Sequence, residues 1–145
     1  MASKIRVEIF SVNNRNNLIP NLWCICAVRL NPIIYDITDQ FVAFNVIEHD
    51  KSFGIVAVYA STSYIKRRQL WNDLTNLQNS FNLPWCYFGD FNTILEASEH
   101  RGRVAPARLS MSDFQPWTSI NDLLHLPTRG VLYTWHNGRL GRGLD

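Results

Sequence analysis

The stretch WCYFGDFN, residues 85–92, decides the fold class, because it joins an apolar run directly to a polar turn. Residues 85–88 form a continuous apolar run, which is typical of a strand buried on both faces. Gly89 permits close approach of backbone or of a ligand. Residues two apart in an extended run share a face, so the side chains of Asp90 and Asn92 are predicted to point the same way.

Asp90 and Asn92 suit the hydrolysis of a negatively charged ester. An ionised carboxylate can accept a proton from water or hold a cation, and a neighbouring carboxamide can orient that water or a phosphate oxygen without adding charge. A second interpretation needs no function, because Asp and Asn are common in Asx turns that lead out of a strand. The spacing alone leaves both interpretations open.

The segment before this run predicts a helix. Ser61, Thr62 or Ser63 can cap its first turn, and Asn82 and Pro84 end it. Its apolar residues recur at three and four positions, as in a helix that buries one stripe: Leu70, Trp71, Leu74, Leu77 and Phe81. Strands are predicted further upstream at Leu22–Val28, Phe41–Ile47 and Phe53–Ala60, with a spacing that favours antiparallel neighbours. The helix and its flanking strands then make a βαβ-like step.

Downstream of the polar turn, residues 96–109 are predicted to form a loop. A second helix is predicted over Ser110–Leu124, with Pro116 kinking it or starting a new turn. A last strand is predicted at Val131–Trp135. The side chains expected to face inward from the second helix are Met111, Phe114, Trp117 or Thr118, and those of residues 120–124.

Composition describes a globular, intracellular protein. The 145 residues are 46% hydrophobic, 12% aromatic and 18% charged, which excludes a disordered chain. Three cysteines are too few for a disulfide framework, so a reducing compartment is expected, either nuclear or cytoplasmic. The longest apolar run, Leu22–Val28, falls short of the roughly 18 residues of a membrane helix, and residues 1–17 do not resemble a secretion signal. No membrane partner is therefore expected.

The positive charge is concentrated at the C-terminal end. The formal net charge is +2, and residues 101–145 carry six arginines against three aspartates. Guanidinium groups bind phosphates well because they present a planar fork of donors. The same arginines also fit an ordinary solvated surface, and the sequence leaves both possibilities open.

Three motifs give the chain a family resemblance: WCYFGDFNTIL, IVAVYASTSYIKRRQLWNDL and LPTRGVLYTWHNGR, in this order. They resemble the endonuclease/exonuclease/phosphatase superfamily, whose members resemble apurinic endonucleases and DNase I, and most closely the endonuclease domain of plant LINE-type non-LTR retrotransposons. The similarity runs from about Leu22 to Arg142. It implies a four-layered α/β sandwich of the DNase I-like type, here incomplete, with residues 1–145 as one partial domain that lacks N-terminal and C-terminal strands.

The resemblance also implies a function for individual residues. Asp90 matches the aspartate that aligns or deprotonates the attacking water, and Asn92 matches its partner, which holds that water and the phosphate. The resemblance also makes both residues candidate ligands of a catalytic Mg²⁺ or Mn²⁺ ion, with DNA as the substrate. Tyr59 matches an active-site tyrosine whose hydroxyl reaches the scissile phosphate, although it also fits a strand aromatic packed in the sheet.

Further residues match the nucleic-acid surface of the family. Trp135, Asn137 and Arg139 belong to the TWxNGR segment, in which Trp135 fits a core position as well as a contact. Arg67 or Arg68 can face phosphate, or can lie on a solvated helix face. TWxNGR also argues against a third possibility, a phosphoinositide or another small phosphoester as substrate.

Two parts of the family's active site have no counterpart in this sequence. The metal-binding glutamate lies upstream in the family, and Glu8 stands in the wrong context to replace it. The final Asp-His pair lies downstream, and neither Asp145 nor any of the four histidines fits it. We therefore expect this chain to be an inactive fragment by itself, with exposed sheet edges that invite self-association. The alternative is a non-catalytic nucleic-acid-binding remnant that uses its arginine-rich end.

Overall fold

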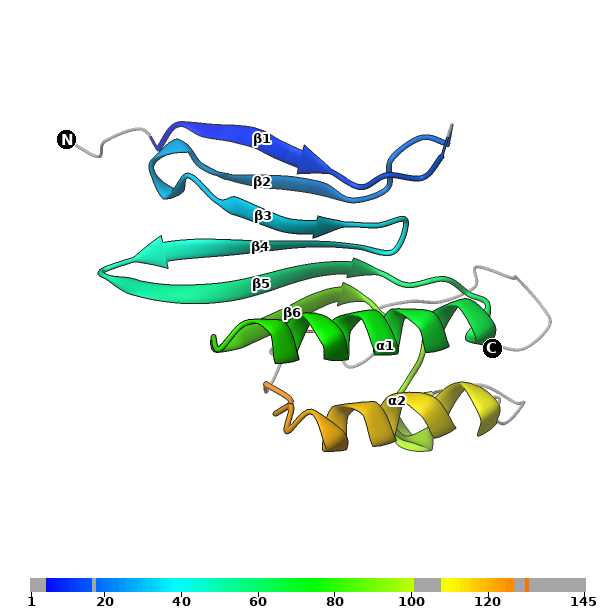
Figure 1. Cartoon of the computed structure of the whole chain (residues 1–145). Coiled ribbons are helices and arrows are strands. Elements are labelled where there is room, and N and C mark those ends of the chain that lie inside the picture. Colours follow the sequence, from blue (N-terminus) through cyan, green and yellow to red (C-terminus); the bar gives the residue numbers. More distant parts are fainter. Residues whose placement is uncertain (1–4, 17, 101–107, 127–129, 131–145) are drawn as a thin grey trace. The chain divides into compact units, whose positions relative to one another are not determined.

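The computed structural model describes residues 5–16, 18–100, 108–126 and 130 (Figure 1). The chain divides into two compact units. Unit 1 comprises Met1–Ser61 with Asn72–Asn92, and unit 2 comprises Thr62–Trp71 with Thr93–Asp145. The description of residues 1–145 as one domain stays a prediction.

Unit 1 contains two β-sheets. The smaller sheet pairs β1 with β2 antiparallel, and the larger has the order β3-β4-β5-β6. Its first two pairings are antiparallel, whereas β5 and β6 are parallel and are connected through α1, as predicted for a βαβ step. The strands are β1 Val7–Val12, β2 Trp23–Ala27, β3 Ile33–Ile37, β4 Phe41–Glu48, β5 Lys51–Tyr59 and β6 Trp85–Asp90. A short 3-10 helix, Val28–Leu30, follows β2.

The predicted strands over residues 22–28, 41–47 and 53–60 are confirmed as β2, β4 and β5. The sequence pattern missed β1 and β3. Both strands carry a register shift, between Ile9 and Ser11 in β1 and between Ile34 and Asp36 in β3. A bulge inserts a residue and breaks the alternation of apolar and polar positions by which a strand is recognised.

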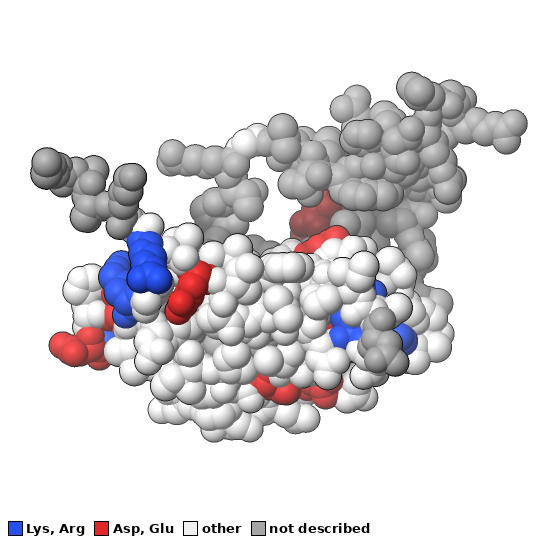
Figure 2. All heavy atoms as spheres, turned by 90° about the horizontal axis from the view of Figure 1, so that it is seen from above, with Lys and Arg blue, Asp and Glu red and all other residues white. Residues whose placement is uncertain are grey.

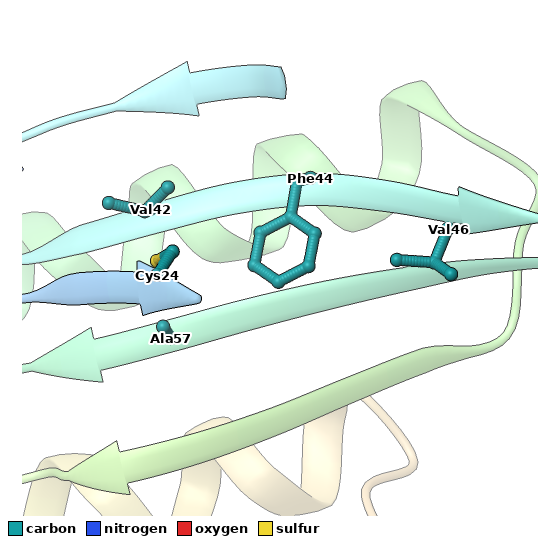
Figure 3. Packing of buried hydrophobic residues seen from close by; sticks show 5 residues of the cluster. All are labelled: Cys24, Val42, Phe44, Val46 and Ala57. Carbon is teal, nitrogen blue, oxygen red and sulfur yellow. The ribbon is translucent and has the colours of Figure 1, made fainter. Parts of the chain in front are cut away.

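The two sheets of unit 1 pack face to face around an apolar cluster. Cys24 of β2 lies over Val42, Phe44, Val46 and Ala57 of the larger sheet (Figure 3). The partly buried Phe10, Leu22, Leu30 and Ile55 pack around this cluster, and the rings of Phe10 and Phe44 meet edge to face with centroids 4.8 Å apart. This inter-sheet core connects the N-terminal hairpin to the strands that lead toward residue 90.

The opposite face of the larger sheet is the better covered one. The helix predicted after Ala60 is confirmed as α1, Tyr64–Ser80, which begins directly after Ser63. Its C-terminal half belongs to unit 1, with Leu74 fully buried and Gln78 accepting a hydrogen bond from the Tyr87 hydroxyl at 2.9 Å. Burial raises the pKa of that hydroxyl, so Tyr87 stays protonated. On this face, the residues Phe41, Val56 and Val58 are completely enclosed.

The prediction that residues 85–88 form a strand buried on both faces is wrong in one respect. β6 is a strand, but it lies at the edge of the described sheet, and Phe88 is 51% exposed on the face away from α1. Cys86 on the same face is exposed too. The apolar run therefore reflects a face that the two described strands of the smaller sheet leave uncovered.

The outer face of the smaller sheet is also apolar. It carries the exposed side chains of Ile5, Val7, Ile9, Trp23 and Ile25. Figure 2 views the side on which β1 and β2 are drawn in Figure 1, and the described surface there shows few charged groups. Such apolar surface commonly marks a contact with further polypeptide.

Unit 2 is organised around three aromatic rings. The ring of Trp71, from α1, lies 5.1 Å from that of Phe114 and 4.8 Å from that of Trp117, both on α2 (Arg108–Ile120). The predicted helix over residues 110–124 is thus present but starts earlier and ends earlier, and it runs through Pro116. A 3-10 turn, Ala97–Glu99, lies within the predicted loop. No described helix is long and apolar enough to cross a membrane.

Three of the inward-facing positions predicted for residues 111–124 are wrong. Ile120 is 77% exposed, Leu124 is 90% exposed, and Asp122 is exposed too. The buried stripe runs through Phe114, Trp117 and Asn121, so Ile120 falls beside it. The helix ends at Ile120, and the left-handed φ of 51° at Asp122 stops the periodicity that would have turned Leu124 inward.

The inter-sheet cluster makes a quantitative prediction. Replacing Phe44 by Ala removes a ring enclosed by both sheets, and we expect the free energy of unfolding to fall by about 3–5 kcal/mol. Ile47→Ala, at an exposed position of the same strand, is the matched control and should cost about 1 kcal/mol or less. Urea denaturation followed by circular dichroism measures both. Equal losses would show that the two sheets do not share a core.

Candidate functional site

The polar turn begins where the backbone of β5 leaves no room for a side chain on β6. A Cβ atom on Gly89 would lie 2.0 Å from the carbonyl oxygen of Val58, and Gly89 has a φ of 131°, which L-residues with side chains rarely adopt. Glycine is therefore required here by the backbone of β5. Of the two roles that the sequence allowed for Gly89, backbone approach is the one observed.

Asp90 and Asn92 are brought together by a turn. β6 ends at Asp90, and the Oδ1 atom of Asp90 accepts a hydrogen bond from the backbone N–H of Asn92 at 2.8 Å. Asn92 has a left-handed φ of 48°, which asparagine tolerates better than most residues. The strand alternation predicted to align the two side chains therefore stops before Asn92, and an Asx turn produces their proximity instead.

The side chain of Asn92 is anchored to the end of β5. Its Nδ2 atom donates to the carbonyl oxygen of Ala60 at 2.7 Å, while the N–H of Ala60 donates to the carbonyl oxygen of Asp90 at 2.8 Å. Ala60 is completely buried. The N–H and the carbonyl oxygen of Ala60, which directly follows β5, thus both bond to the turn after β6. These bonds fix the orientation of the Asn92 carboxamide.

Tyr59 lies beside this turn. It is the register partner of Asp90 in the parallel pairing of β5 with β6, so the two side chains leave the same face of the sheet. Tyr59 is 43% exposed, which does not fit the alternative of a ring packed inside the sheet. The structure therefore gathers Tyr59, Asp90 and Asn92 at one end of the β5–β6 pair.

The gathered groups present a carboxylate and a phenol to solvent. Asp90 is exposed, and its second oxygen, Oδ2, is not used by the turn. A carboxylate fixed through one oxygen can accept a proton, or bind a cation or a water molecule, through the other. The carboxamide of Asn92 keeps its oxygen directed away from the Ala60 bond, which uses the nitrogen. The arrangement suits a water molecule held next to an anionic group.

These residues alone do not complete a divalent-metal site. Mg²⁺ and Mn²⁺ prefer several oxygen ligands, including carboxylates. Among the residues that the structure describes, no group of three or more His, Cys, Asp or Glu side chains is placed to hold a metal ion. Asp90 with Asn92 fits at most one side of such a site.

The two arginines considered for phosphate contact behave differently. Arg67 is only 3% exposed, and its guanidinium donates to the carbonyl oxygen of Thr62 at 2.9 Å. Burial lowers the pKa of Arg67, and the charge of Asp113 partly offsets this. Neither a phosphate-facing nor a solvated position therefore fits Arg67. Arg68 is the surface residue, with an ion pair to Asp113 at 2.8 Å and its guanidinium over the ring of Tyr64.

The TWxNGR residues Trp135, Asn137 and Arg139 lie outside the described residues, as does the strand predicted at 131–135. Their contribution to a nucleic-acid surface stays a prediction. So does the contribution of the remaining C-terminal arginines.

Sequence reasoning missed Gln40. This residue precedes β4, and its side chain is 7% exposed. Its Oε1 atom accepts from the N–H of Ser61 at 2.7 Å, and its backbone carbonyl accepts from the N–H of Tyr59 at 2.8 Å. A polar residue directly before an apolar strand usually indicates a turn, so nothing in the local pattern pointed to this link.

Comparison with known proteins shows a shared fold. No protein-family model and no curated protein sequence matches this chain. Among solved structures it is similar to the endonuclease domain of TRAS1, a telomere-specific non-LTR retrotransposon, with a TM-score of 0.70 and 15% sequence identity. The match covers 94% of this chain and 62% of that one. The chain therefore has a mixed α/β fold, with two sheets and two helices among the described residues, that matches the fold of a retrotransposon endonuclease domain, and it spans less than two thirds of that structure.

Proposed function

We propose that this chain is the central part of a metal-dependent DNA endonuclease domain of retrotransposon origin, closest to those of plant LINE elements. The observation that carries the proposal is the turn after β6, which holds Asp90 and Asn92 next to Tyr59. The fold shared with the TRAS1 endonuclease domain supports it. The substrate in this proposal is a nucleic-acid phosphodiester.

Each residue has a defined part in the proposed reaction. Asp90 accepts a proton from the attacking water through the oxygen that the Asx turn leaves available. Asn92 holds the water or a phosphate oxygen, and its bond to Ala60 fixes its direction. The hydroxyl of Tyr59 donates a hydrogen bond to a phosphate oxygen. A bound Mg²⁺ or Mn²⁺ would stabilise charge on the phosphate and on the leaving oxygen.

We further propose that these 145 residues do not cut DNA by themselves. The family's metal-binding glutamate and its final Asp-His pair are not in this sequence, and the described residues supply only part of a metal site. Hard cations bind weakly without further carboxylate ligands. A longer polypeptide that adds these residues would restore cleavage.

We also propose that the protein is intracellular, either nuclear or cytoplasmic.

The cleavage proposal is tested by nicking of supercoiled plasmid in the presence of Mg²⁺ or Mn²⁺. The 145-residue chain should leave the plasmid intact, whereas the reading frame extended through its flanking genomic sequence should nick it. In the extended protein, Asp90→Asn keeps the turn acceptor but removes the charged base, and the rate should fall about 10²–10⁴-fold. Glu8→Gln, at an exposed carboxylate on β1, is the matched control and should cut normally. Cleavage that survives Asp90→Asn would refute the site.

A non-catalytic nucleic-acid-binding remnant is the second candidate, and the six arginines of residues 101–145 favour it. Phosphate contacts release counterions, so binding to a labelled duplex should weaken with a log–log salt slope of about −0.9 per contact. The double variant Arg139→Gln/Arg142→Gln should make this salt slope shallower by about 2. The control variant Arg29→Gln, which removes an ion pair with Glu48, should leave the slope unchanged. Fluorescence anisotropy measures both. Binding that does not respond to salt would remove this candidate.

Self-association is proposed through the edge that β6 forms in the described part of the sheet, with a second copy as the partner. The face beside this edge, with Phe88 and Cys86 exposed, continues directly from the inter-sheet core through Ile55 and Ala57. Strand edges of this kind pair readily, and a lysine on the edge prevents pairing. We expect Phe88→Lys to convert a dimer into a monomer in analytical ultracentrifugation, and Ile19→Lys, in an exposed loop, to leave the dimer intact. A wild-type monomer at all concentrations would contradict the proposal.

A further inference from the structure

The segment that joins β5 to α1 is held by a residue far from it in the sequence. Gln40 lies in the turn between β3 and β4, and it accepts hydrogen bonds from both ends of residues 59–61. Its backbone carbonyl accepts from the N–H of Tyr59 at 2.8 Å, and its side-chain Oε1 accepts from the N–H of Ser61 at 2.7 Å. These two bonds bracket Ala60.

Ala60 is the residue to which the polar turn is attached. Its N–H donates to the carbonyl oxygen of Asp90, and its carbonyl oxygen accepts from the Nδ2 atom of Asn92. A displacement of Ala60 therefore moves both site residues at once. A continuous path of hydrogen bonds leads from the side chain of Gln40, through Ala60, to the Asn92 carboxamide.

The turn that carries Gln40 is itself constrained. The Oγ1 atom of Thr38 accepts from the N–H groups of Gln40 and Phe41, at 3.1 and 3.0 Å. The carbonyl oxygen of Asp39 accepts from Nδ2 of Asn13 at 3.0 Å, and Asn13 is only 2% exposed. The backbone around Gln40 is thus held by hydrogen bonds to Thr38 and to Asn13, the residue that follows β1.

We propose that Gln40 is a positioning residue, which sets the orientation of Asn92 and the placement of Asp90 through Ala60. The inference rests on the proposed function for its catalytic meaning, because it assigns Gln40 to the geometry of that same site. A glutamine suits the task because it has the length to reach the part-buried N–H of Ser61 and supplies an acceptor oxygen there. Loss of this hydrogen bond would disfavour the conformation of residues 59–61.

Three variants separate positioning from general stability. Gln40→Asn keeps the amide but is one methylene too short to reach Ser61, and Gln40→Glu keeps both the length and the acceptor oxygen. Ser52→Ala is the matched control, because it removes a side-chain hydrogen bond to Asn45 at the opposite end of β5. Gln40→Asn and Ser52→Ala thus each remove one side-chain hydrogen bond within unit 1.

Nuclear magnetic resonance of the 145-residue chain detects the hydrogen bonds that link Gln40 to Asn92. In Gln40→Asn we expect the amide exchange of Ser61 to rise about fivefold to tenfold. The side-chain NH₂ signals of Asn92 should change in chemical shift, and their hydrogen exchange with solvent should become faster. Gln40→Glu should restore both signatures to within about twofold, and Ser52→Ala should leave both unchanged. Asn92 signals that are the same in Gln40→Asn and in wild type would overturn the inference, as would equal changes in Ser52→Ala.

The extended, cutting protein gives a second readout. Loss of positioning should lower kcat about tenfold in Gln40→Asn and leave KM within about twofold, with recovery in Gln40→Glu. Failure of the proposed function is distinguishable from failure of the inference. If plasmid nicking does not depend on Asp90 but Asn92 still responds to Gln40, the function is wrong and the positioning holds. If nicking depends on Asp90 but Gln40→Asn leaves kcat unchanged, the positioning is wrong.

Discussion

The contact between Gly89 and the carbonyl of Val58 is the constraint on which the candidate site depends. It leaves no room for a side chain, so β6 runs against β5 at the very point where the strand gives way to the polar turn. The next residues along both strands, Tyr59 and Asp90, then stand opposite each other. Ala60 completes the junction by bonding to the backbone of Asp90 and to the side chain of Asn92. Two strands that are neighbours only in the folded protein thus build the site jointly.

The Asx-turn interpretation and the functional interpretation of GDFN turn out to describe the same atoms. The bond from Asp90 Oδ1 to the N–H of Asn92 forms the turn, and it is also what brings the carboxylate and the carboxamide together. It uses one carboxylate oxygen and leaves the other directed outward. The second anchor, from Asn92 to Ala60, holds the carboxamide in one direction.

The two faces of the larger sheet differ in a way that bears on the rest of the domain. The α1 side encloses Val56 and Val58, whereas the opposite side is covered near β4 and left open near β6, where Phe88 is exposed. The open part adjoins Asp90. The similar endonuclease structure is longer, since the match covers 62% of it. A polypeptide segment packed over Phe88 would bury this apolar face and place its side chains beside Asp90.

The sequence by itself determined the elements whose signal is local. Helix α1 and strands β2, β4 and β5 followed from apolar periodicity, and GDFN was recognisable as a polar turn after a strand. Tertiary structure alone decided the rest. Phe88 of β6 is exposed because the burial of a strand face depends on what packs against it, and the buried guanidinium of Arg67 donates a hydrogen bond to the carbonyl oxygen of Thr62. The side chain of Gln40 reaches the N–H of Ser61, 21 residues away in the sequence, only after β4 and β5 pair. Periodicity reports which way a side chain points, but only the packed chain determines what it meets there.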